Sequence, residues 1–440
     1  MTRTLDQALH RLETQTGIRE TGVVDQVIGL TIESKGPTAR LGDLCLIETM
    51  EPATPPQPAE VVGFRDGKLL LMPLDKMAAL SPGCRVINTG HPFRIGVNDA
   101  LIGRVLDGLG NPMDDRFTIG HTEHHPVTAD PPHPLRRKEI DTPLALGVKS
   151  LDGFVTLGRG QRIGIFSGSG VGKSTTLGMI ARNTEADISV IALIGERGRE
   201  VQDFIENVLG PEGIRRAVVV VATSEEPALM KIKAALVATT IAEYFRDQGK
   251  NVILMMDSLT RVAMALREVG LAVGEPPATR GYTPSVFSFI PRLVERAGTA
   301  EEGAITGIYT VLVEGDDFNE PVSDMVRGLL DGHIILSRAL AEHNHFPAVD
   351  VLGSISRLMI QIADPAHRAA AGKIRDLMAV YNKSEDLINI GAYAPGNNPK
   401  LDLAVALKPE IDTLLQQAVD ESVQLEETVR KIQWLADKIG

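Results

Sequence analysis

The chain has 440 residues, of which 43% are hydrophobic and 23% charged, and its formal net charge is −12. This length predicts two to four domains, and the composition is typical of a soluble globular protein. The acidic balance argues against general nucleic-acid binding, which relies on a basic surface. Only Cys45 and Cys84 occur, which excludes a disulfide framework and fits a reducing cytoplasm. No apolar run reaches the roughly eighteen residues that a membrane span needs.

The N-terminal segment lacks the continuous apolar core of a secretory signal. Its apolar residues Leu5, Ala8, Leu9 and Leu12 recur at helical spacing, so residues 1–19 are predicted to form a short amphipathic helix. Two uses of the apolar face stay open, because it could dock on its own domain or meet a partner or lipid.

Residues 20–92 alternate short β-rich runs, such as DLCLIE and GKLLLMP, with turns. Asp66-Gly67 between two such runs is a hairpin signal. Five or six short strands in about seventy residues predict a small closed barrel.

Residues 93–365 are predicted to form the second unit. Its first part, up to about residue 145, is irregular and includes a connector rich in Pro and His. The connector's histidines are interpreted as solvated polar residues rather than as a metal cluster; they are His121, His124, His125 and His133.

Apolar β-branched runs and helical stretches then alternate along the chain. The expected strands are QRIGIFS, ISVIALIG, AVVVVAT, NVILMMD and GIYTVLV, and EPALMKIKAALVATTIAEYFRDQ is expected to be an amphipathic helix. This alternation predicts an α/β fold with a parallel sheet covered by helices on both faces. Residues 366–440 are predicted to form a helical domain: Ile374, Leu377, Met378 and Tyr381 share one face, and Ile411, Leu414, Leu415, Ala418, Val419 and Leu425 share another.

The stretch FSGSGVGKS lies between an expected strand and an expected helix. Its glycines let backbone N–H groups face a phosphate, and the helix N-terminus adds unpaired donors and a positive dipole. Lys173 could reach the β- and γ-phosphates, and the Ser174 hydroxyl could bind Mg²⁺. Ser167 stands where the strict phosphate-loop pattern has glycine, and a small residue can fill that place. The predicted nucleotide contacts in this loop are Gly168, Ser169, Gly170, Val171, Gly172, Lys173, Ser174 and Thr175.

Acidic residues follow two of the expected strands. NVILMMD ends in Asp257, where a carboxylate could hold a Mg²⁺-bound water. A polar strand end is the alternative, but an apolar strand that ends in Asp downstream of a phosphate loop favours the metal role. ISVIALIG is followed by Glu196 and Arg197. Glu196 could polarise an attacking water and Arg197 could bind phosphate oxygens, or both could belong to a charged, solvated loop.

Further motifs follow in a fixed order: GERGRE, LMMDSLTR, EPPATRGYTPSVF, PRLVERAG, VEGDDFNEP, DGHIILSRALAE, FPAVDVLGSISR and INIGAYAPGNNPKLD. From about residue 20 to the C-terminus the chain resembles the export ATPases of bacterial flagella and type III secretion systems, relatives of the rotary F- and V-type ATPases. The resemblance implies a small β-barrel, a RecA-like P-loop NTPase core and a helical C-terminal domain in a homohexameric ring.

The resemblance also implies roles for single residues. Lys173 and Ser174 match the phosphate lysine and the Mg²⁺ ligand, Glu196 the catalytic carboxylate, and Asp257 a second carboxylate near the metal. Arg197 and Arg261 match contacts to the γ-phosphate. Arg357 matches the arginine finger given to the neighbouring subunit's site, and Phe346 matches an aromatic at the adenine.

The implied activity is ATP hydrolysis with Mg²⁺ that energises protein export, in the cytoplasm and peripherally at the inner face of the cytoplasmic membrane. The implied partners are a stator-like regulator at the N-terminal region, a coiled-coil stalk protein, export substrates with their chaperones, and the membrane export gate, with no nucleic acid among them. The flagellar branch is favoured over the injectisome branch on resemblance alone.

Other functions fit the same core. A catalytic subunit of a proton- or sodium-coupled rotary ATPase usually carries an acidic DELSEED-like run, where this chain has GAYAPGNNPKLD. A non-catalytic ring subunit usually lacks the carboxylate at Glu196. A Rho-type RNA translocase needs an RNA surface, which the net charge and 4% aromatic content do not obviously supply. A pure scaffold gives no reason for these site residues to coexist.

Overall fold

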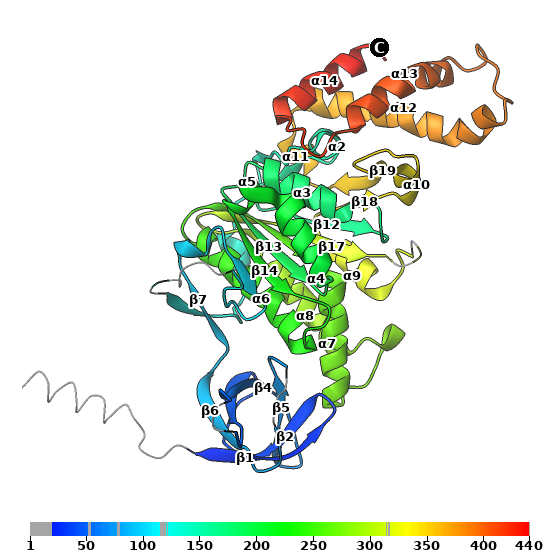
Figure 1. Ribbon diagram of the computed structural model, residues 1–440. Helices are drawn as coiled ribbons and strands as arrows, with labels where there is room; N and C mark the ends of the chain where they lie inside the picture. Colours follow the sequence, from blue (N-terminus) through cyan, green and yellow to red (C-terminus); the bar gives the residue numbers. More distant parts are fainter. Residues whose placement is uncertain are drawn as a thin grey trace, which may run out of the picture.

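A computed structural model of the chain describes residues 20–51, 54–76, 80–114, 120, 122–313, 315 and 317–439. The amphipathic helix predicted over residues 1–19 and the predicted solvated His121 lie outside these described residues. A β-barrel and a group of long helices lie at opposite ends of a central sheet that is covered by helices (Figure 1).

The N-terminal strands form a closed barrel of six strands, as the turn-rich pattern predicts. The strands are β1 (Thr21–Ile28), β2 (Thr31–Lys35), β3 (Asp43–Glu48), β4 (Gln57–Arg65), β5 (Lys68–Pro73) and β6 (Arg85–Pro92). The barrel closes because β1 pairs with both β2 and β6. Asp66 and Gly67 take φ values of 50° and 73° and join β4 to β5 in the expected two-residue hairpin.

The middle of the chain forms a mixed sheet in the order β19-β18-β12-β17-β15-β13-β14-β8, with β16 beside β17. The strands are β8 (Val105–Asp107), β12 (Arg162–Ser167), β13 (Ile188–Ile194), β14 (Ala217–Ala222), β15 (Asn251–Asp257), β16 (Gly298–Thr299), β17 (Ala304–Leu312), β18 (Gly332–Leu336) and β19 (Val349–Ser356). All five expected strands are present and parallel to their neighbours on this path.

The two edges of the sheet differ from the prediction of a purely parallel sheet. At one edge β19 runs antiparallel to β18. At the other edge the short strand β8, from a segment expected to be irregular, pairs with β14. A three-residue strand carries too little alternation to be recognised. Outside the main sheet two strand pairs occur: β7 (Arg94–Val97) with β9 (Glu123–Pro126), and β10 (Pro143–Leu144) with β11 (Leu157–Gly158).

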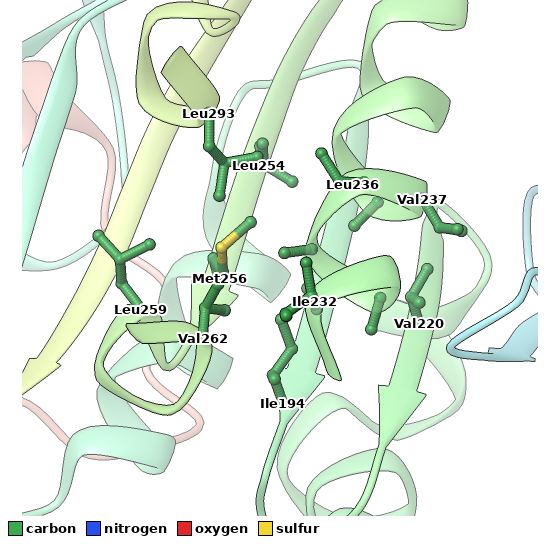
Figure 2. Packing of buried hydrophobic residues seen from close by; sticks show 14 of the residues in the cluster. Ile194, Val220, Ile232, Leu236, Val237, Leu254, Met256, Leu259, Val262 and Leu293 are labelled. Atoms are coloured by element: carbon green, nitrogen blue, oxygen red, sulfur yellow. The ribbon is translucent and has the colours of Figure 1, made fainter. Parts of the chain in front are cut away.

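Both faces of the sheet are buried, which explains the uninterrupted apolar runs of its strands. In β13, Val190 and Ile194 belong to the hydrophobic cluster on one face, and Ile191 and Leu193 to the cluster on the other. Helices α6 (Ala228–Arg246), α7 (Leu259–Val273) and α8 (Pro284–Glu295) cover the first face. Figure 2 shows this packing between the sheet, α6 and α7, with labelled residues Ile194, Val220, Leu254 and Met256 facing Ile232, Leu236, Val237, Leu259 and Val262.

Helix α6 was expected to be amphipathic, but all of its residues except Lys231 and Tyr244 are buried. Its charged residues are covered because neighbouring elements supply partners. Lys233 forms an ion pair with Glu60 of the barrel strand β4, and Glu243 with Arg296 after α8. Helix α6 therefore joins the barrel to the sheet.

The other face of the sheet carries helix α3 (Lys173–Asn183). The C-terminal helices share its hydrophobic cluster but lie at the end of the sheet, beside β19; they are α12 (Pro365–Asn389), α13 (Pro399–Leu415) and α14 (Leu425–Asp437). The shorter helices are α2 (Lys149–Phe154), α4 (Gly198–Asp203), a π-helical turn Phe204–Leu209, α5 (Gly210–Ile214), α9 (Pro321–Leu329), α10 (Arg338–Glu342) and α11 (Met359–Ile362). The 3₁₀ turns are Asp99–Leu101, Pro134–Arg136 and Thr279–Gly281. No helix among the described residues is both long enough and apolar enough to cross a bilayer.

The predicted C-terminal helical domain is present, and Ile374 and Leu377 of α12 are buried as expected. The second predicted face was wrong in part, because α13 ends at Leu415 and Val419 is 44% exposed. The chain leaves the helix where the Gln417 side chain donates to the Gly147 carbonyl and accepts from the Lys149 N–H. These bonds tie the link between α13 and α14 to the start of α2.

Candidate functional site

The candidate site lies at the carboxyl edge of the parallel strands. Strand β12 ends at Ser167, β13 at Ile194 and β15 at Asp257. Since β13 pairs with β15 in register, Leu193 lies beside Asp257, and the segments that follow these strands meet at one edge. Open α/β sheets bind their ligands at this edge.

The loop from Gly168 to Gly172 connects β12 to α3, as expected for a phosphate loop. Gly170 and Gly172 take φ values of 78° and 86°, a conformation that favours glycine. Gly172 directly precedes the first turn of α3, where Ser174 is exposed and Thr175 half-buried. The first helical N–H groups and the Ser174 hydroxyl are therefore available to a ligand.

Ser167 fills the place of the glycine of the strict pattern. It is 2% exposed, and its Oγ has no hydrogen-bond partner among the described residues. The small side chain is therefore buried at the end of β12.

Lys173, Glu196 and Asp257 come together although they follow three different strands. The Lys173 Nζ lies 2.5 Å from Asp257 Oδ1 and 3.3 Å from Glu196 Oε1. The Asp257 side chain is 2% exposed, whereas those of Lys173 and Glu196 are 12% and 16% exposed. Burial alone would lower the pKa of the Lys173 ammonium, but the charges and hydrogen bonds of Asp257 and Glu196 outweigh burial and raise it. Lys173 therefore stays charged at neutral pH.

Thr310 of β17 is a site residue that the sequence analysis missed. Its Oγ1 donates to Asp257 Oδ1 at 2.8 Å, within the buried part of the site. The one available signal was a hydroxyl residue inside the otherwise apolar run GIYTVLV, and such residues also occur in strands for packing alone.

Arg261 lies against the segment that carries Glu196. A Cβ built on Gly195 would stand 2.9 Å from the Arg261 Cγ, so the glycine permits this close approach. The Arg261 Nε is buried and has no hydrogen-bond partner among the described residues. A buried guanidinium nitrogen of this kind is available to an anionic ligand.

Arg197 does not join the cluster. Its side chain is 81% exposed and its Nη1 lies 3.4 Å from Glu200 Oε1, one helical turn onward in α4. This contact is an exposed pair of adjacent helix positions and holds the side chain only weakly.

Phe346 lies next to the phosphate loop. A Cβ built on Gly172 would be 3.4 Å from the Phe346 ring, which is 39% exposed. A partly exposed ring beside a phosphate loop offers a flat surface to a nucleotide base. The Phe346 backbone is held by the segment after α13, because the Phe346 carbonyl accepts a hydrogen bond from the Gln417 N–H.

Arg357 lies at the amino ends of the parallel strands, whereas its own phosphate loop lies at their carboxyl ends. Strand β19 begins at Val349, which pairs with Leu336, and Leu336 in turn pairs with Ser167 at the loop end of β12. The strand then runs 8 residues away from the loop, roughly 25 Å at about 3.3 Å per residue. Arg357 is exposed there, and the structure does not bring it together with Lys173 of the same chain.

The oxygen donors at the site are of the hard type that Mg²⁺ prefers, with the Asp257 carboxylate and the Ser174 hydroxyl flanking Lys173. In the described ranges, this site included, no group of three or more His, Cys, Asp and Glu residues could by itself hold a metal ion. His124 and His125 of the connector lie on β9, and His133 caps a short 3₁₀ turn by accepting from the Leu135 N–H.

Comparison with known proteins agrees with this architecture. Residues 147–356 match the family model described as "ATP synthase alpha/beta family, nucleotide-binding domain", and residues 24–90 match "ATP synthase alpha/beta family, beta-barrel domain". Residues 363–433 match "T3SS EscN ATPase C-terminal domain".

Relatives and solved structures are similar over nearly the whole chain. The "Flagellum-specific ATP synthase" of Bacillus subtilis is 54% identical over 418 residues, which cover 95% of each chain. The "Type 3 secretion system ATPase" of Xanthomonas euvesicatoria is 48% identical over 419 residues, again 95% of each chain. The assembled ATPase EscN of enteropathogenic E. coli, solved in complex with its central stalk EscO, superposes with a TM-score of 0.87 at 45% identity, covering 94% of this chain and 100% of that one.

The fold and the site thus define a P-loop ATPase of the ATP synthase α/β type. More narrowly, the chain belongs to the family of flagellar and type III secretion ATPases. The match of its C-terminal helices to the type III secretion model favours export over the rotary and RNA-translocating alternatives.

Proposed function

We propose that the chain hydrolyses ATP with Mg²⁺ as a homohexameric ring, and that each site is completed by Arg357 of a neighbouring copy. The separation of Arg357 from its own phosphate loop carries this proposal. Lys173, Glu196 and Asp257 meet at the carboxyl ends of the parallel strands. Arg357 lies at the opposite, amino ends of these strands, where only another molecule's site could use it.

The phosphate loop binds the nucleotide. Backbone N–H groups from Gly168 to Thr175 and the Lys173 ammonium contact the phosphates. Ser174 and Asp257 would hold Mg²⁺, which neutralises phosphate charge when bound. Glu196 orients and polarises the attacking water as a general base. Phe346 packs against the adenine.

Positive side chains complete the site. Arg261 contacts the γ-phosphate from its position beside Gly195. Arg197 joins it once its exposed side chain turns inward from Glu200, a movement that breaks only a weak pair. Arg357, acting in trans, stabilises the charge of the transition state and is worth about 10³–10⁵ in rate.

Hydrolysis energises the export of protein substrates through a flagellar or type III secretion apparatus. EscN was solved with a central stalk, and a coiled-coil stalk is the corresponding partner proposed for this chain. The other proposed partners are a stator-like regulator at the N-terminal region, export substrates with their chaperones, and the membrane export gate. The chain acts in the cytoplasm, peripherally at the inner face of the membrane.

The test is the ATPase rate per subunit as a function of protein concentration. The wild-type rate should rise cooperatively as rings form. Glu196→Gln should stay nearly silent at every concentration, because it lacks the general base. Arg357→Ala should keep its affinity for ATP and lose the rise. Full activity of Arg357→Ala at ring-forming concentrations would overturn the proposal.

A further inference from the structure

We infer that Gln161 is a positioning residue that holds Arg357 in place, an inference that rests on the proposed function of Arg357. Gln161 directly precedes β12 and is fully buried, with 0% of its surface exposed. The side-chain amide of a buried glutamine needs hydrogen-bond partners within the protein, and these partners show which segments Gln161 fixes in place.

The Gln161 amide is bonded to the turn that carries Arg357. Its Nε2 donates to the Ser356 Oγ at 3.0 Å and to the Asp331 carbonyl at 3.2 Å. The Arg357 backbone N–H donates to the same Asp331 carbonyl at 2.9 Å. Gln161 therefore contacts the residue before Arg357 and shares the carbonyl that fixes the Arg357 backbone.

Asp331 is itself tied to the first residue of β12. Its N–H donates to the Arg162 carbonyl at 2.8 Å, and its Oδ2 accepts from the Arg162 N–H at 3.0 Å. On the next residue, a Cβ built on Gly332 would stand 2.3 Å from the Ile355 carbonyl oxygen, so glycine permits β19 to approach this closely.

The Arg357 side chain has little anchoring of its own. It is exposed, and within the described part of the chain its one side-chain hydrogen bond runs from Nη2 to the Arg327 carbonyl at 3.5 Å, the limit for a hydrogen bond. The direction of the guanidinium is thus determined mainly by the backbone that Gln161 and Asp331 hold. A displacement of about 1 Å at a catalytic group can cost about 10²-fold in rate.

One strand consequently serves two different sites. The carboxyl end of β12 leads into the phosphate loop of its own site, and its amino end, through Gln161, holds the finger offered to a neighbour. A change at Gln161 could therefore act in cis, by disturbing the loop, or in trans, by misplacing Arg357. The two effects are separable, because a ring interface takes the loop from one copy and the finger from the next.

The experiment uses Gln161→Leu in the full-length chain. We expect the rate per subunit of the assembled protein to fall about 10- to 100-fold, with the affinity of the protomer for ATP unchanged. Rings are then assembled from equal amounts of Gln161→Leu and Glu196→Gln. If the defect is in trans, about one interface in four joins an intact loop to an intact finger, and activity returns to about a quarter of the wild-type rate.

Two further mixtures make the result decisive. Arg357→Ala mixed with Glu196→Gln tests the finger alone, and its failure to recover would overturn the proposed function and this inference together. If activity recovers in the Arg357→Ala mixture but not in the Gln161→Leu mixture, the proposed role of Gln161 is wrong and the role of Arg357 stands.

Matched variants guard against misfolding. Thr306→Val removes a hydroxyl that accepts from the Gly160 N–H at 2.8 Å, one residue from Gln161 but away from Arg357. It should lose stability without losing the concentration-dependent rate. Ser356→Ala removes one partner of Gln161 with less disruption and should show a smaller loss that the same mixture rescues. If Gln161→Leu does not fold, an unrescued loss in Ser356→Ala contradicts the inference, as does no loss at all.

Discussion

Lys173 and Asp257 form a buried ion pair across 84 residues of sequence, with 2.5 Å between Nζ and Oδ1. Such pairs gain little net stability, because the desolvation of two charges offsets their attraction. The pair instead holds the Lys173 ammonium charged and in position before a nucleotide arrives. If Lys173 binds the nucleotide as proposed, phosphate would replace a carboxylate as its partner, so that binding would exchange one set of charge contacts for another.

Removing only one member of this pair should destabilise the nucleotide-free protein. Lys173→Met leaves the Asp257 and Glu196 carboxylates without their cation, which should lower the free energy of unfolding by about 3 kcal/mol. The double variant Lys173→Met/Asp257→Asn should recover more than half of that loss, although neither variant hydrolyses ATP. Thermal unfolding of both proteins without nucleotide checks this. Equal destabilisation in the two would show that the buried charge is not the cause.

Thr310→Val should slow hydrolysis while leaving ring assembly intact. The substitution keeps the shape of the side chain and removes the hydrogen bond to Asp257. A hydrogen bond to a charged group is worth about 1.5–3 kcal/mol, so kcat should fall about 10- to 150-fold, with a smaller change in KM. Steady-state kinetics at ring-forming concentration measure both. Thr306→Val, on the same strand but not bonded to Asp257, is the control and should keep its kcat.

The sequence predicted five strands of the main sheet, because each carried a continuous apolar run, and it predicted Lys173 and Ser174, because a phosphate loop is a local motif. The position of Asp257 was also foreseeable, since it ends a strand downstream of that loop. Thr310 and Gln161 were not, because their roles arise from pairings between strands that are distant in sequence. A polar residue in or next to a strand does not reveal which neighbour it faces.

The charged residues of α6 show the same limit. In an amphipathic helix, Lys233 and Glu243 are expected on the solvent-exposed face. Both are buried, because elements distant in sequence pack against the helix and supply their partners. The orientation of Arg197 was equally beyond the sequence. The residues left a phosphate contact and a solvated loop both open and the resemblance implied the contact, whereas the side chain lies in solvent beside Glu200.

Phe346→Ala should weaken nucleotide binding with little effect on the chemical step. Stacking of a base on an aromatic ring is worth about 1–3 kcal/mol, so the Kd for ATP should rise about 5- to 150-fold. Phe346→Tyr keeps the ring and should bind nearly as the wild type does. Titration of a fluorescent ATP analogue measures the affinities. An unchanged Kd for Phe346→Ala would place the adenine elsewhere.

The docking of the C-terminal helices should weaken in mild acid because of His367. This buried residue of α12 bonds through Nε2 to the Gly153 carbonyl of α2 at 2.8 Å, so Nε2 carries the proton and donates. Burial lowers the pKa of His367 below its ordinary value of 6.5, against smaller opposing effects of the Gly153 carbonyl and Asp364. The unfolded chain then binds a proton more readily than the folded one. Stability is therefore full above pH 6.5 and declines as the pH falls below that value toward the folded-state pKa.

His367→Gln separates this residue from the other groups that titrate in the same range. The glutamine amide can still donate to the Gly153 carbonyl but takes up no proton. Thermal unfolding between about pH 7.5 and pH 5 should show a smaller decline in the variant than in the wild type, whatever the difference at the upper end. Burial also lowers the pKa values of His333 and His345, so a residual decline is expected in the variant. Identical slopes in the two proteins would mean that His367 takes up its proton equally in the folded and unfolded states.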